Sequence, residues 1–350
     1  MIRIGVLGFA HGHCAAILKE WQAHPEYGVT PAGGWDHDPD RAQASCREYG
    51  MPCFDSPEAL LSSDISAVLI TSETGYHADM VRRAAGAGKD IILYKPMALT
   101  MKEADSIVEA VEQSGVRFTM GWQMRTDPQN RRMRDMIRGG ELGRTCLFRR
   151  RHSLPTHIWA GFEDTWHNDP AMNRDIFADD SSHPINLMQW IFGMPETVTC
   201  EMSTMVNPRV PNDNAVAMFR YADGLIAEIS CSFTCSASEI TTEVYCEKGS
   251  IQQYFGDNPG ARLPRVAGMP GLKWYKEGDA DWTDSDIPSP ASHGPRIGWQ
   301  AAPLADFLKG GEPICSVREG RDTLRLVLAC YLSAREGRRV SVNDPAIYDI

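Results

Sequence analysis

The first 122 residues alternate short, unbroken apolar runs with segments that carry helix-capping residues, and this alternation limits the possible folds more than any other feature of the chain. Strands that are apolar without alternation are typical of a parallel sheet covered on both faces. Parallel strands need long crossover connections, which are usually helices. The pattern therefore predicts an α/β domain with a parallel sheet over residues 1–122. Its strands are expected at 2–7, 29–35, 67–71, 91–94 and 118–122.

Capping residues support the predicted crossover helices. Asp38-Pro39 is typical of an N-cap followed by proline in the first turn, and Ser56-Pro57 repeats the arrangement. Thr100 and Glu103 fit a capping box, which opens a helix that is expected to end near Ser114.

Residues 123–350 show a different pattern and predict an α+β domain. A polar helix is expected to end at Arg138. Residues 256–295 are dense in Gly, Pro, Asp and Ser, which predicts a long irregular excursion on the surface. The remaining elements are β-rich stretches at 144–152, 197–205, 214–234 and 241–254, helices in 299–309 and 321–336, and a final strand at Val340–Val342.

The composition is that of a globular protein. Hydrophobic residues make up 43% and charged residues 23% of the 350, and no apolar run approaches the roughly 18 residues that a membrane span needs. The net charge of −11 repels a polyanion such as nucleic acid. The N-terminus leads directly into a predicted strand and has no signal-peptide pattern. We therefore expect a cytoplasmic protein that binds neither nucleic acid nor membranes.

The ten cysteines occur singly, without a Cys-x-x-Cys pair. Cys231 and Cys235 are expected on one face of one strand, where their sulfurs are badly placed to bridge each other. We expect reduced cysteines that pack in the interior. His11 and His13 lie two residues apart, but no neighbouring carboxylate or cysteine completes a ligand set, so no metal is expected.

A dinucleotide-binding turn is expected between the first strand and the first helix. Gly8 provides the tight turn, Ala10 stands in place of the second glycine of the fingerprint, and His13 stands in place of the third, with Gly12 one residue early. Backbone N–H groups at a helix N-terminus still attract pyrophosphate. An ordinary strand-to-helix turn is the alternative interpretation.

Asp36 ends the second predicted strand, where a carboxylate can accept both ribose hydroxyls of NAD and would meet the phosphate of NADP. No arginine follows immediately, since the next residues are His37 and Asp38. The sequence therefore favours NAD over NADP. The alternative is a solvated loop aspartate that caps the next helix, a role for which Asp38 is better placed.

Two further segments carry residues suited to chemistry on a substrate. Lys95 closes the fourth strand, and ligands gather at the carboxyl ends of strands in open α/β sheets. Asp179 and His183 lie four residues apart and share a face of a helix. Taken alone, the alternatives are a surface lysine and a structural His-Pro at a helix start.

Several separate segments resemble the Gfo/Idh/MocA family of NAD(P)-dependent sugar and polyol oxidoreductases, in the right order and over nearly the whole chain. The family's Glu-Lys-Pro signature appears as Tyr94-Lys95-Pro96, and its second catalytic segment as Asp179–Trp190. The resemblance implies a Rossmann domain followed by an α+β domain with an open, mostly antiparallel sheet, which serves substrate binding and assembly into a homodimer or homotetramer. Further matches are Gly121–Arg125, Tyr221–Gly224, Glu243–Ser250 and Ser333–Gly337.

The resemblance implies that a secondary alcohol of a sugar, sugar derivative or polyol is oxidised by hydride transfer to NAD. Histidine has a pKa near the working pH without tuning, so His183 is expected to accept the proton. Lys95 is expected to polarise the oxygen, and Asp179 to orient the sugar or the imidazole. Residues expected at the cofactor are Gly8, Phe9, Ala10, His11, Gly12, His13, Asp36, Ser72, Thr74, His77, Tyr94, Lys95 and Gln123. Residues expected at the carbohydrate are Lys95, Arg125, Arg151, Trp166, His167, Asp179, Asp180 and His183.

Some positions depart from the family pattern. Tyr94 replaces the signature glutamate and removes a charge beside Lys95. On the strand predicted at 144–152, Arg149 and Arg151 share one face. Arg150 and His152 take the other face. A solvated or interface face is the favoured interpretation, and the alternative is that at least one arginine of this segment faces the cleft and holds an anionic group.

Two other functions stay open at this point. One is a glycoside-cleaving enzyme in which NAD oxidises a sugar carbon, elimination or hydrolysis follows, and the carbon is reduced again. The other is a non-catalytic, nucleotide-binding regulatory protein, which the loss of the glutamate at Tyr94 favours. Retention of Lys95, Asp179 and His183 argues against the second.

Overall fold

The computed structural model describes residues 1–237, 240–254, 268–289 and 294–350 and divides the chain into two compact units. The N-terminal unit comprises Met1–Gln123, Ala171–Asn173 and Ile297–Leu324. The C-terminal unit comprises Met124–Pro170, Arg174–Arg296 and Arg325–Ile350. A division after residue 122 was expected. The observed division differs from it because two later segments, Ala171–Asn173 and Ile297–Leu324, belong to the N-terminal unit.

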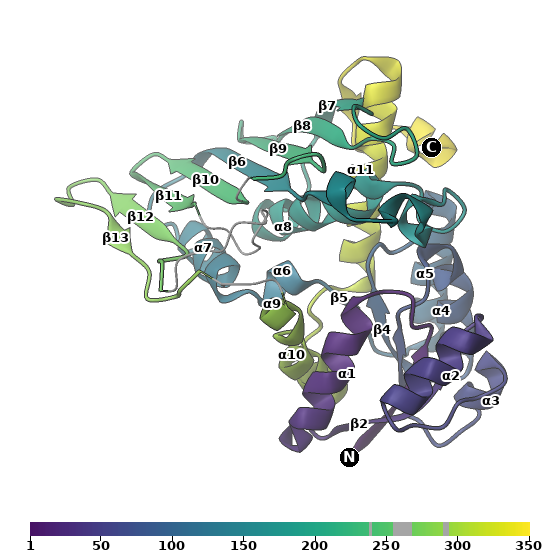
Figure 1. The fold of residues 1–350 in the computed structure, drawn as a ribbon. Coiled ribbons are helices and arrows are strands. Elements are labelled where there is room, and N and C mark those ends of the chain that lie inside the picture. The colour runs from purple at the N-terminus through teal and green to yellow at the C-terminus, as the bar shows by residue number, and fades with distance from the viewer. Residues whose placement is uncertain (238–239, 255–267, 290–293) are drawn as a thin grey trace. The chain divides into compact units, whose positions relative to one another are not determined.

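The N-terminal unit is built on a five-stranded parallel sheet with the order β2-β1-β3-β4-β5 (Figure 1). The predicted strands are confirmed: they are β1 Ile2–Leu7, β2 Val29–Trp35, β3 Ala67–Ile70, β4 Asp90–Tyr94 and β5 Phe118–Gly121. The helices are α1 His13–Ala23, α2 Pro39–Glu48, α3 Pro57–Leu61, α4 His77–Gly86, α5 Met101–Ser114 and α10 Ala301–Leu308, with short 3-10 turns at Pro25–Tyr27 and Thr74–Tyr76. This is the predicted α/β architecture, with helices on both faces of the sheet.

The predicted caps form as expected. The Asp38 carboxylate accepts hydrogen bonds from the amides of Asp40 and Arg41 at the start of α2. Thr100 and Glu103 form the capping box of α5, which ends at Ser114. These local signals place the helix ends, and hence the loops at the carboxyl edge of the sheet.

Helix α10 contributes to the core of the N-terminal unit although it lies far away in the sequence. Leu304 and Phe307 are buried in the same cluster as Leu18 and Trp21 of α1. The Trp21 indole donates a hydrogen bond of 2.9 Å to the carbonyl of Ala301. The unit therefore needs α10 to complete one face of its sheet.

The C-terminal unit is built on an open sheet with nine strands among the described residues, in the order β13-β12-β11-β10-β6-β9-β8-β7-β14. Only the β6–β9 pair among these is parallel, so the predicted open and mostly antiparallel sheet is confirmed. The strands are β6 Thr145–Ser153, β7 Thr197–Ser203, β8 Asn214–Arg220, β9 Ile226–Ser232, β10 Thr241–Cys246, β11 Gly249–Gln253, β12 Lys273–Lys276, β13 Thr283–Asp284 and β14 Val340–Ser341.

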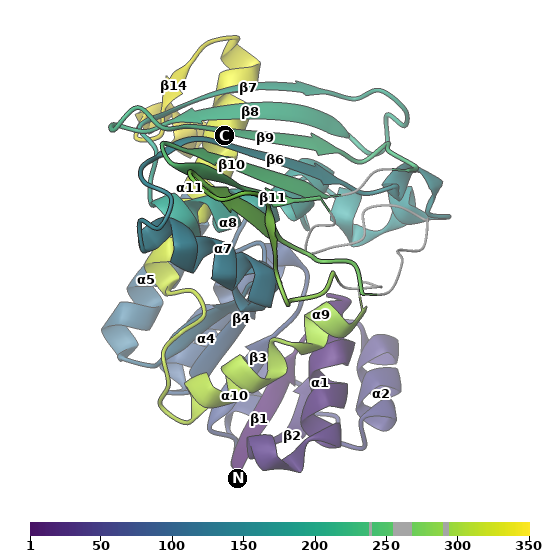
Figure 2. The same cartoon turned by 90° about the vertical axis from the view of Figure 1, so that its left-hand side faces the viewer.

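Helices α7 and α8 lie against one face of this sheet, as Figure 2 shows. A π-helical turn at Phe177–Ser181 leads directly into α8. The remaining helices are α6 Gln123–Thr126, α7 Pro128–Arg138, α8 Ser182–Phe192, α9 Gly294–Gly298 and α11 Val317–Glu336, with 3-10 turns at Thr156–Ile158, Phe162–Asp164, Trp166–Asn168 and Pro345–Asp349. The division between the units falls within α9, after Arg296, and within α11, after Leu324. The residues predicted to be catalytic in this half of the chain lie on the π-turn and the first turn of α8.

Three expectations need correction. The stretch 256–295 was expected to be irregular, but β12 and β13 extend the sheet there, since β12 pairs with β11 and β13 pairs with β12. Residues 256–267 and 290–293 of that stretch lie outside the described part. Cys235 lies beyond the end of β9 and does not share its face with Cys231. All ten cysteines are free, but Cys53 and Cys146 are exposed instead of packed inside.

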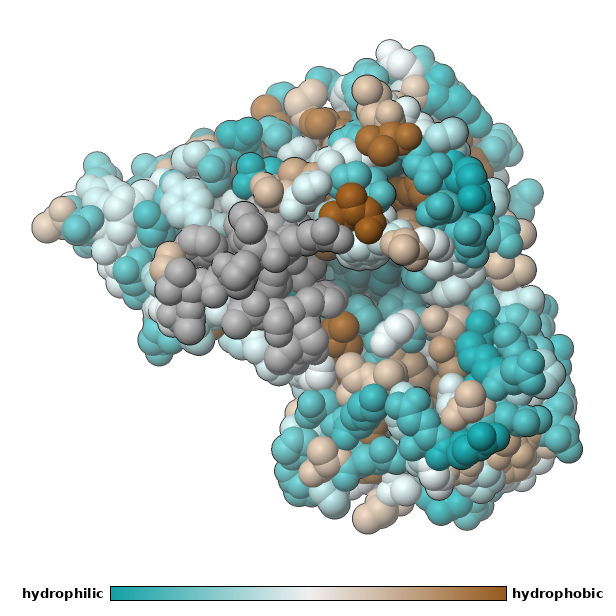
Figure 3. Space-filling model, in the orientation of Figure 1, coloured by the Kyte–Doolittle hydropathy of each residue, from teal (hydrophilic) through white to brown (hydrophobic). Residues whose placement is uncertain are grey.

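No helix in the described part of the chain is long and apolar enough to cross a membrane. On the face seen in Figure 3, hydrophobic side chains occur in small, separate patches among hydrophilic ones.

Candidate functional site

The turn after β1 has the geometry of a phosphate-binding turn. Gly8 has φ +84°, and a Cβ on it would lie 2.4 Å from the Cα of Ser72, so only glycine fits. Within the described residues, the amides of Ala10 and Gly12 donate to no acceptor, and both precede the first residue of α1. Unsatisfied N–H groups at a helix N-terminus are suited to an anion, so this turn fits the pyrophosphate of a dinucleotide.

Tyr94 fills the space beneath this turn. Its ring centroid lies 5.2 Å from that of His11 and 5.8 Å from that of His13. A Cβ on Gly121 would lie 2.8 Å from the Tyr94 ring, so the neighbouring strand keeps a glycine to admit it. The hydroxyl is buried and has no hydrogen-bond partner among the described residues, and burial raises the pKa of Tyr94 well above its usual value. A neutral phenol therefore replaces the family's carboxylate at this position.

Asp36 ends β2, as predicted, but its carboxylate is already engaged. The amide of Phe9 donates to Oδ2 at 2.7 Å, and the amide of Asp38 donates to Oδ1 at 2.9 Å. Arg41 donates from Nε and from its terminal nitrogen to the two oxygens, each at 2.7 Å. Arg41 also reaches Glu73 at 2.8 Å. The sequence interpretation missed Arg41, because it considered only the residues immediately after Asp36.

Lys95 lies directly after β4 and is only 4% exposed. His77 is fully buried beside it in the fold: Nδ1 lies 2.8 Å from the carbonyl of Pro96 and Nε2 lies 3.1 Å from that of Ser72. Burial lowers the pKa of His77 to about 4. His77 therefore joins two loops at the carboxyl edge of the sheet and is a positioning residue.

Three other residues expected at the cofactor lie in the N-terminal unit. Ser72 and Thr74 are buried after β3, and the Thr74 hydroxyl donates to the Asn173 side chain at 2.8 Å. Asn173 belongs to the short segment that returns to this unit. Gln123 is buried directly after Trp122, at the end of the unit.

In the C-terminal unit, Asp180 lies between two histidines. Its Oδ2 lies 2.7 Å from Nε2 of His152, and its Oδ1 lies 3.9 Å from Nε2 of His183. His152 projects from β6, whereas Asp180 and His183 come from the π-turn and α8. Asp179 precedes them on the same turn and is also buried. A carboxylate beside an imidazole stabilises the ring when it takes up a proton, which suits a proton acceptor.

Two buried arginines lie on the same side of the sheet. Arg125 donates from Nε to the Asn186 side chain of α8 at 2.9 Å. Arg150 donates to the Thr242 hydroxyl at 2.8 Å and is 1% exposed. Asn186, which replaces an acidic residue of the family pattern, is therefore an acceptor for a guanidinium.

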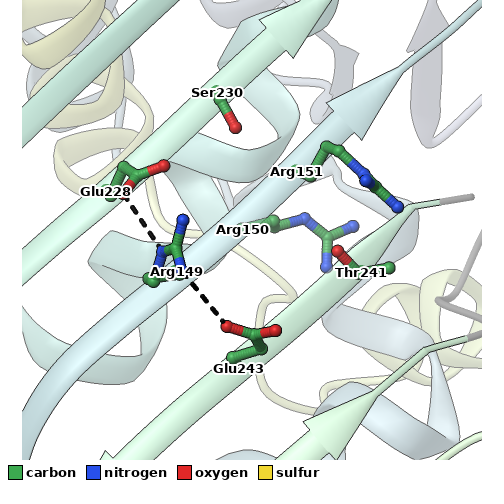
Figure 4. A pocket seen from close by; sticks show the side chains of 7 residues that line it. All are labelled: Arg149, Arg150, Arg151, Glu228, Ser230, Thr241 and Glu243. Carbon is green, nitrogen blue, oxygen red and sulfur yellow. Dashed lines mark hydrogen bonds and ion pairs between the residues drawn. The ribbon is translucent and has the colours of Figure 1, made fainter. Parts of the chain in front are cut away.

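Arg151 was expected at the substrate. Its side chain projects from the exposed face of the sheet, opposite the face that carries Arg150 and His152 (Figure 4). It lies with Arg149 in a shallow pocket that Ser230 and Thr241 also line. Arg149 is paired with Glu228 at 3.1 Å and with Glu243 at 3.6 Å. Since side chains alternate along a strand, Arg150 and His152 share the helix-covered face. The predicted alternation is thus confirmed. It places Arg150, and not Arg151, on the face that carries His152, and the contact of Arg151 with substrate stays a prediction.

Trp166 and His167 stack on each other in a 3-10 turn, with ring centroids 4.0 Å apart. Phe162 lies 5.7 Å from the His167 ring. Both residues are partly exposed, so the pair offers an aromatic surface in a loop of the C-terminal unit.

Comparison with known proteins agrees with this architecture. Residues 2–122 match the model of the oxidoreductase family with an NAD-binding Rossmann fold, and residues 130–252 match that of the GFO/IDH/MocA C-terminal domain. These matches define an NAD(P)-dependent oxidoreductase. The chain belongs to the Gfo/Idh/MocA family, so the predicted resemblance is confirmed.

Individual relatives are distant. The chain is 25% identical to D-apiose dehydrogenase of Paraburkholderia graminis, over 88% of this chain and 82% of that one. It is 24% identical to myo-inositol 2-dehydrogenase of Thermotoga maritima, over 73% and 75% of the two chains. Among solved structures, levoglucosan dehydrogenase in complex with NADH and levoglucosan superimposes with a TM-score of 0.85 at 19% identity, covering 98% of this chain and 100% of that one.

Proposed function

We propose that this protein is an NAD-dependent dehydrogenase that oxidises a secondary alcohol of a sugar, sugar derivative or polyol. The observation that carries the proposal is the His152–Asp180–His183 arrangement in a chain of this oxidoreductase family. Relatives named for D-apiose, myo-inositol and levoglucosan support a polyhydroxylated substrate. The buried Lys95 after β4 supplies the cation that such chemistry uses on the alcohol oxygen.

The proposed roles follow from these positions. A nicotinamide cofactor, when bound, would supply the acceptor for the hydride of the alcohol carbon. His183 takes the hydroxyl proton, and Asp180 stabilises the resulting positive charge on the ring. Lys95 polarises the oxygen, and Asp179 orients the sugar. The Ala10 and Gly12 amides would hold the pyrophosphate of the cofactor, and Asp36 would hold its adenosine half once Arg41 withdraws.

A panel of sugars, polyols and glycosides incubated with NAD tests this function, with NADH absorbance and organic product followed together. A true substrate should give NADH in a one-to-one ratio with ketone product. Glycoside cleavage without net NADH would instead show that oxidation is transient. No turnover of any compound, despite tight NADH binding, would favour a regulatory protein.

The Lys95→Ala variant tests the mechanism on the best substrate from that panel. Turnover should fall by roughly 100-fold or more, because the oxygen loses its cationic partner, while NADH binding measured by fluorescence persists. Unchanged turnover would remove Lys95 from the mechanism. Lys102→Ala, a change in an exposed lysine of α5, is a matched control.

Assembly through the open face of the large sheet is also part of the proposal. That face carries exposed apolar side chains, Val216 and Met218 on β8 and Tyr245 on β10, around the paired Arg149. Apolar residues on an uncovered sheet face are suited to contact with a second copy. A homodimer or homotetramer is therefore expected.

A further inference from the structure

The strongest unassigned feature is the position of Arg41, which occupies both oxygens of the carboxylate that NAD would need. A carboxylate offers about four lone-pair sites for hydrogen bonds. Two of the four donors to Asp36 are the amides of Phe9 and Asp38, and the other two come from Arg41. The Asp36 side chain is fully buried. Its hydrogen-bonding capacity is therefore used up within the protein.

The two amides belong to the backbone and cannot leave, so a ribose can reach Asp36 only where Arg41 withdraws. The Arg41 side chain is able to move, because it is 27% exposed. The backbone of Arg41 stays in place, because its amide donates to the Asp38 cap of α2. Ribose hydroxyls of NAD and the Arg41 guanidinium thus compete for the same two oxygens.

The charges around Arg41 determine what else the site can bind. The single guanidinium of Arg41 pairs with two carboxylates, Asp36 and Glu73. These three side chains together carry one net negative charge when His37 is neutral. His37 lies 3.2 Å from Asp36 and 3.5 Å from Glu73, and its ring lies over Tyr76 at 4.6 Å. Without Arg41, a 2′-phosphate would meet two uncompensated carboxylates. With it, the phosphate meets a guanidinium that can bind it through two nitrogens.

We infer that Arg41 determines cofactor specificity: it weakens NAD binding by competing for Asp36 and allows NADP to bind by offering a partner for the 2′-phosphate. The inference rests on the proposed use of NAD and refines it. The site takes both dinucleotides, NADH more tightly because one net negative charge remains. Helix α2 brings Arg41 back to Asp36 over one helical turn, so an arginine lies beside this carboxylate although none follows it immediately in the sequence.

Binding of NADH and NADPH to the full chain, without substrate, tests this by fluorescence titration. In Arg41→Gln, NADH should bind more tightly and NADPH more weakly, so that the ratio of the two dissociation constants changes at least ~10-fold in favour of NADH. Glu73→Gln removes a negative charge that faces the phosphate and should shift the ratio the other way. Arg47→Gln makes the same charge change at an exposed position of α2 and should leave the ratio within about twofold.

The outcomes separate the inference from the proposed function. If wild type binds both dinucleotides and Arg41→Gln leaves their ratio unchanged, or weakens both equally with a lower melting temperature, Arg41 is only a structural ion-pair partner and the inference is wrong. If wild type binds neither, the proposed function itself fails and the inference with it.

Discussion

Tyr94 shows how a single residue changes the chemistry beside an otherwise preserved signature. A carboxylate at this position would carry a charge into a site lined by His11, His13 and Cys14, whereas the phenol stays neutral. Its ring needs the space that Gly121 leaves open. The lysine that follows is kept, so the substitution alters the surroundings of the catalytic cation without removing it.

Tyr94→Phe should separate packing from cofactor contact. Removing a buried hydroxyl that has no partner among the described residues should raise the free energy of unfolding by about 1 kcal/mol, measured by urea denaturation of the cofactor-free protein. If the hydroxyl bonds to the bound dinucleotide, NADH affinity should fall several-fold in the same variant. A variant that is less stable than wild type would contradict the packing argument.

Asp180→Asn should lower turnover without weakening NADH binding. The change keeps the size of the side chain but removes the charge next to His183 and His152, so kcat should fall by at least ~10-fold with a smaller change in KM. Steady-state kinetics on the best substrate measure it. Glu201→Gln, at an exposed position of β7, controls for a general effect of charge. A wild-type kcat in Asp180→Asn would exclude the carboxylate from proton transfer.

How far the site could be predicted differs from residue to residue. The position of Asp36 follows from a strand end, which is a local property of the sequence, whereas the roles expected for Lys95 and His183 come from the resemblance to the family. Arg41 and His152 do not, because their roles depend on the direction of a long side chain and on which face of β6 the helices cover. The position of Arg151 on the exposed face of β6 could not be predicted for the same reason: alternation gives two faces but does not say which one is buried.

At the scale of single elements, His77 at the start of α4 links the loops that carry Ser72 and Pro96. Its pKa in the folded protein is about 4, compared with 6.5 in an unfolded chain, because burial disfavours the charged ring. Between these pH values the unfolded chain binds more protons than the folded one. The contribution of His77 is thus fully present above pH 6.5 and is lost as the pH falls towards 4.

The N-terminal unit should therefore lose about 3 kcal/mol of stability between pH 6.5 and 4 through this one ring. Urea denaturation at a series of pH values measures the slope. His77→Asn should flatten that slope, at the cost of lower stability near neutral pH. An equally steep slope in His77→Asn would assign the effect to other groups.

Helix ends and most strands were predictable because caps and apolar runs act over a few residues, as at Asp38 and Thr100. β12 was hidden by its Gly- and Pro-rich neighbours, and its pairing with β11 is a contact that no local pattern encodes. The return of residues 297–324 to the N-terminal unit is likewise a long-range effect, carried by α10.

At the scale of the whole molecule, the open sheet face should determine the oligomeric state. Met218→Asp places a charge among exposed apolar side chains and should lower the mass measured by light scattering, since a buried charge without a partner is costly. NADH binding should persist. Met205→Asp, at a loop residue that is 70% exposed, is the control. An unchanged mass in Met218→Asp would place any interface elsewhere.

The way α10 completes the N-terminal core bears on attempts to recombine this chain with its relatives. A fragment cut at Gln123 would bare the side of α1 that Leu304 and Phe307 cover, and it would leave the Trp21 indole without the carbonyl it bonds. The nucleotide-binding unit therefore cannot be exchanged between relatives with a single crossover point. A chimaera that exchanges the whole nucleotide-binding unit between family members must transplant residues 297–324 and 171–173 together with the first 123.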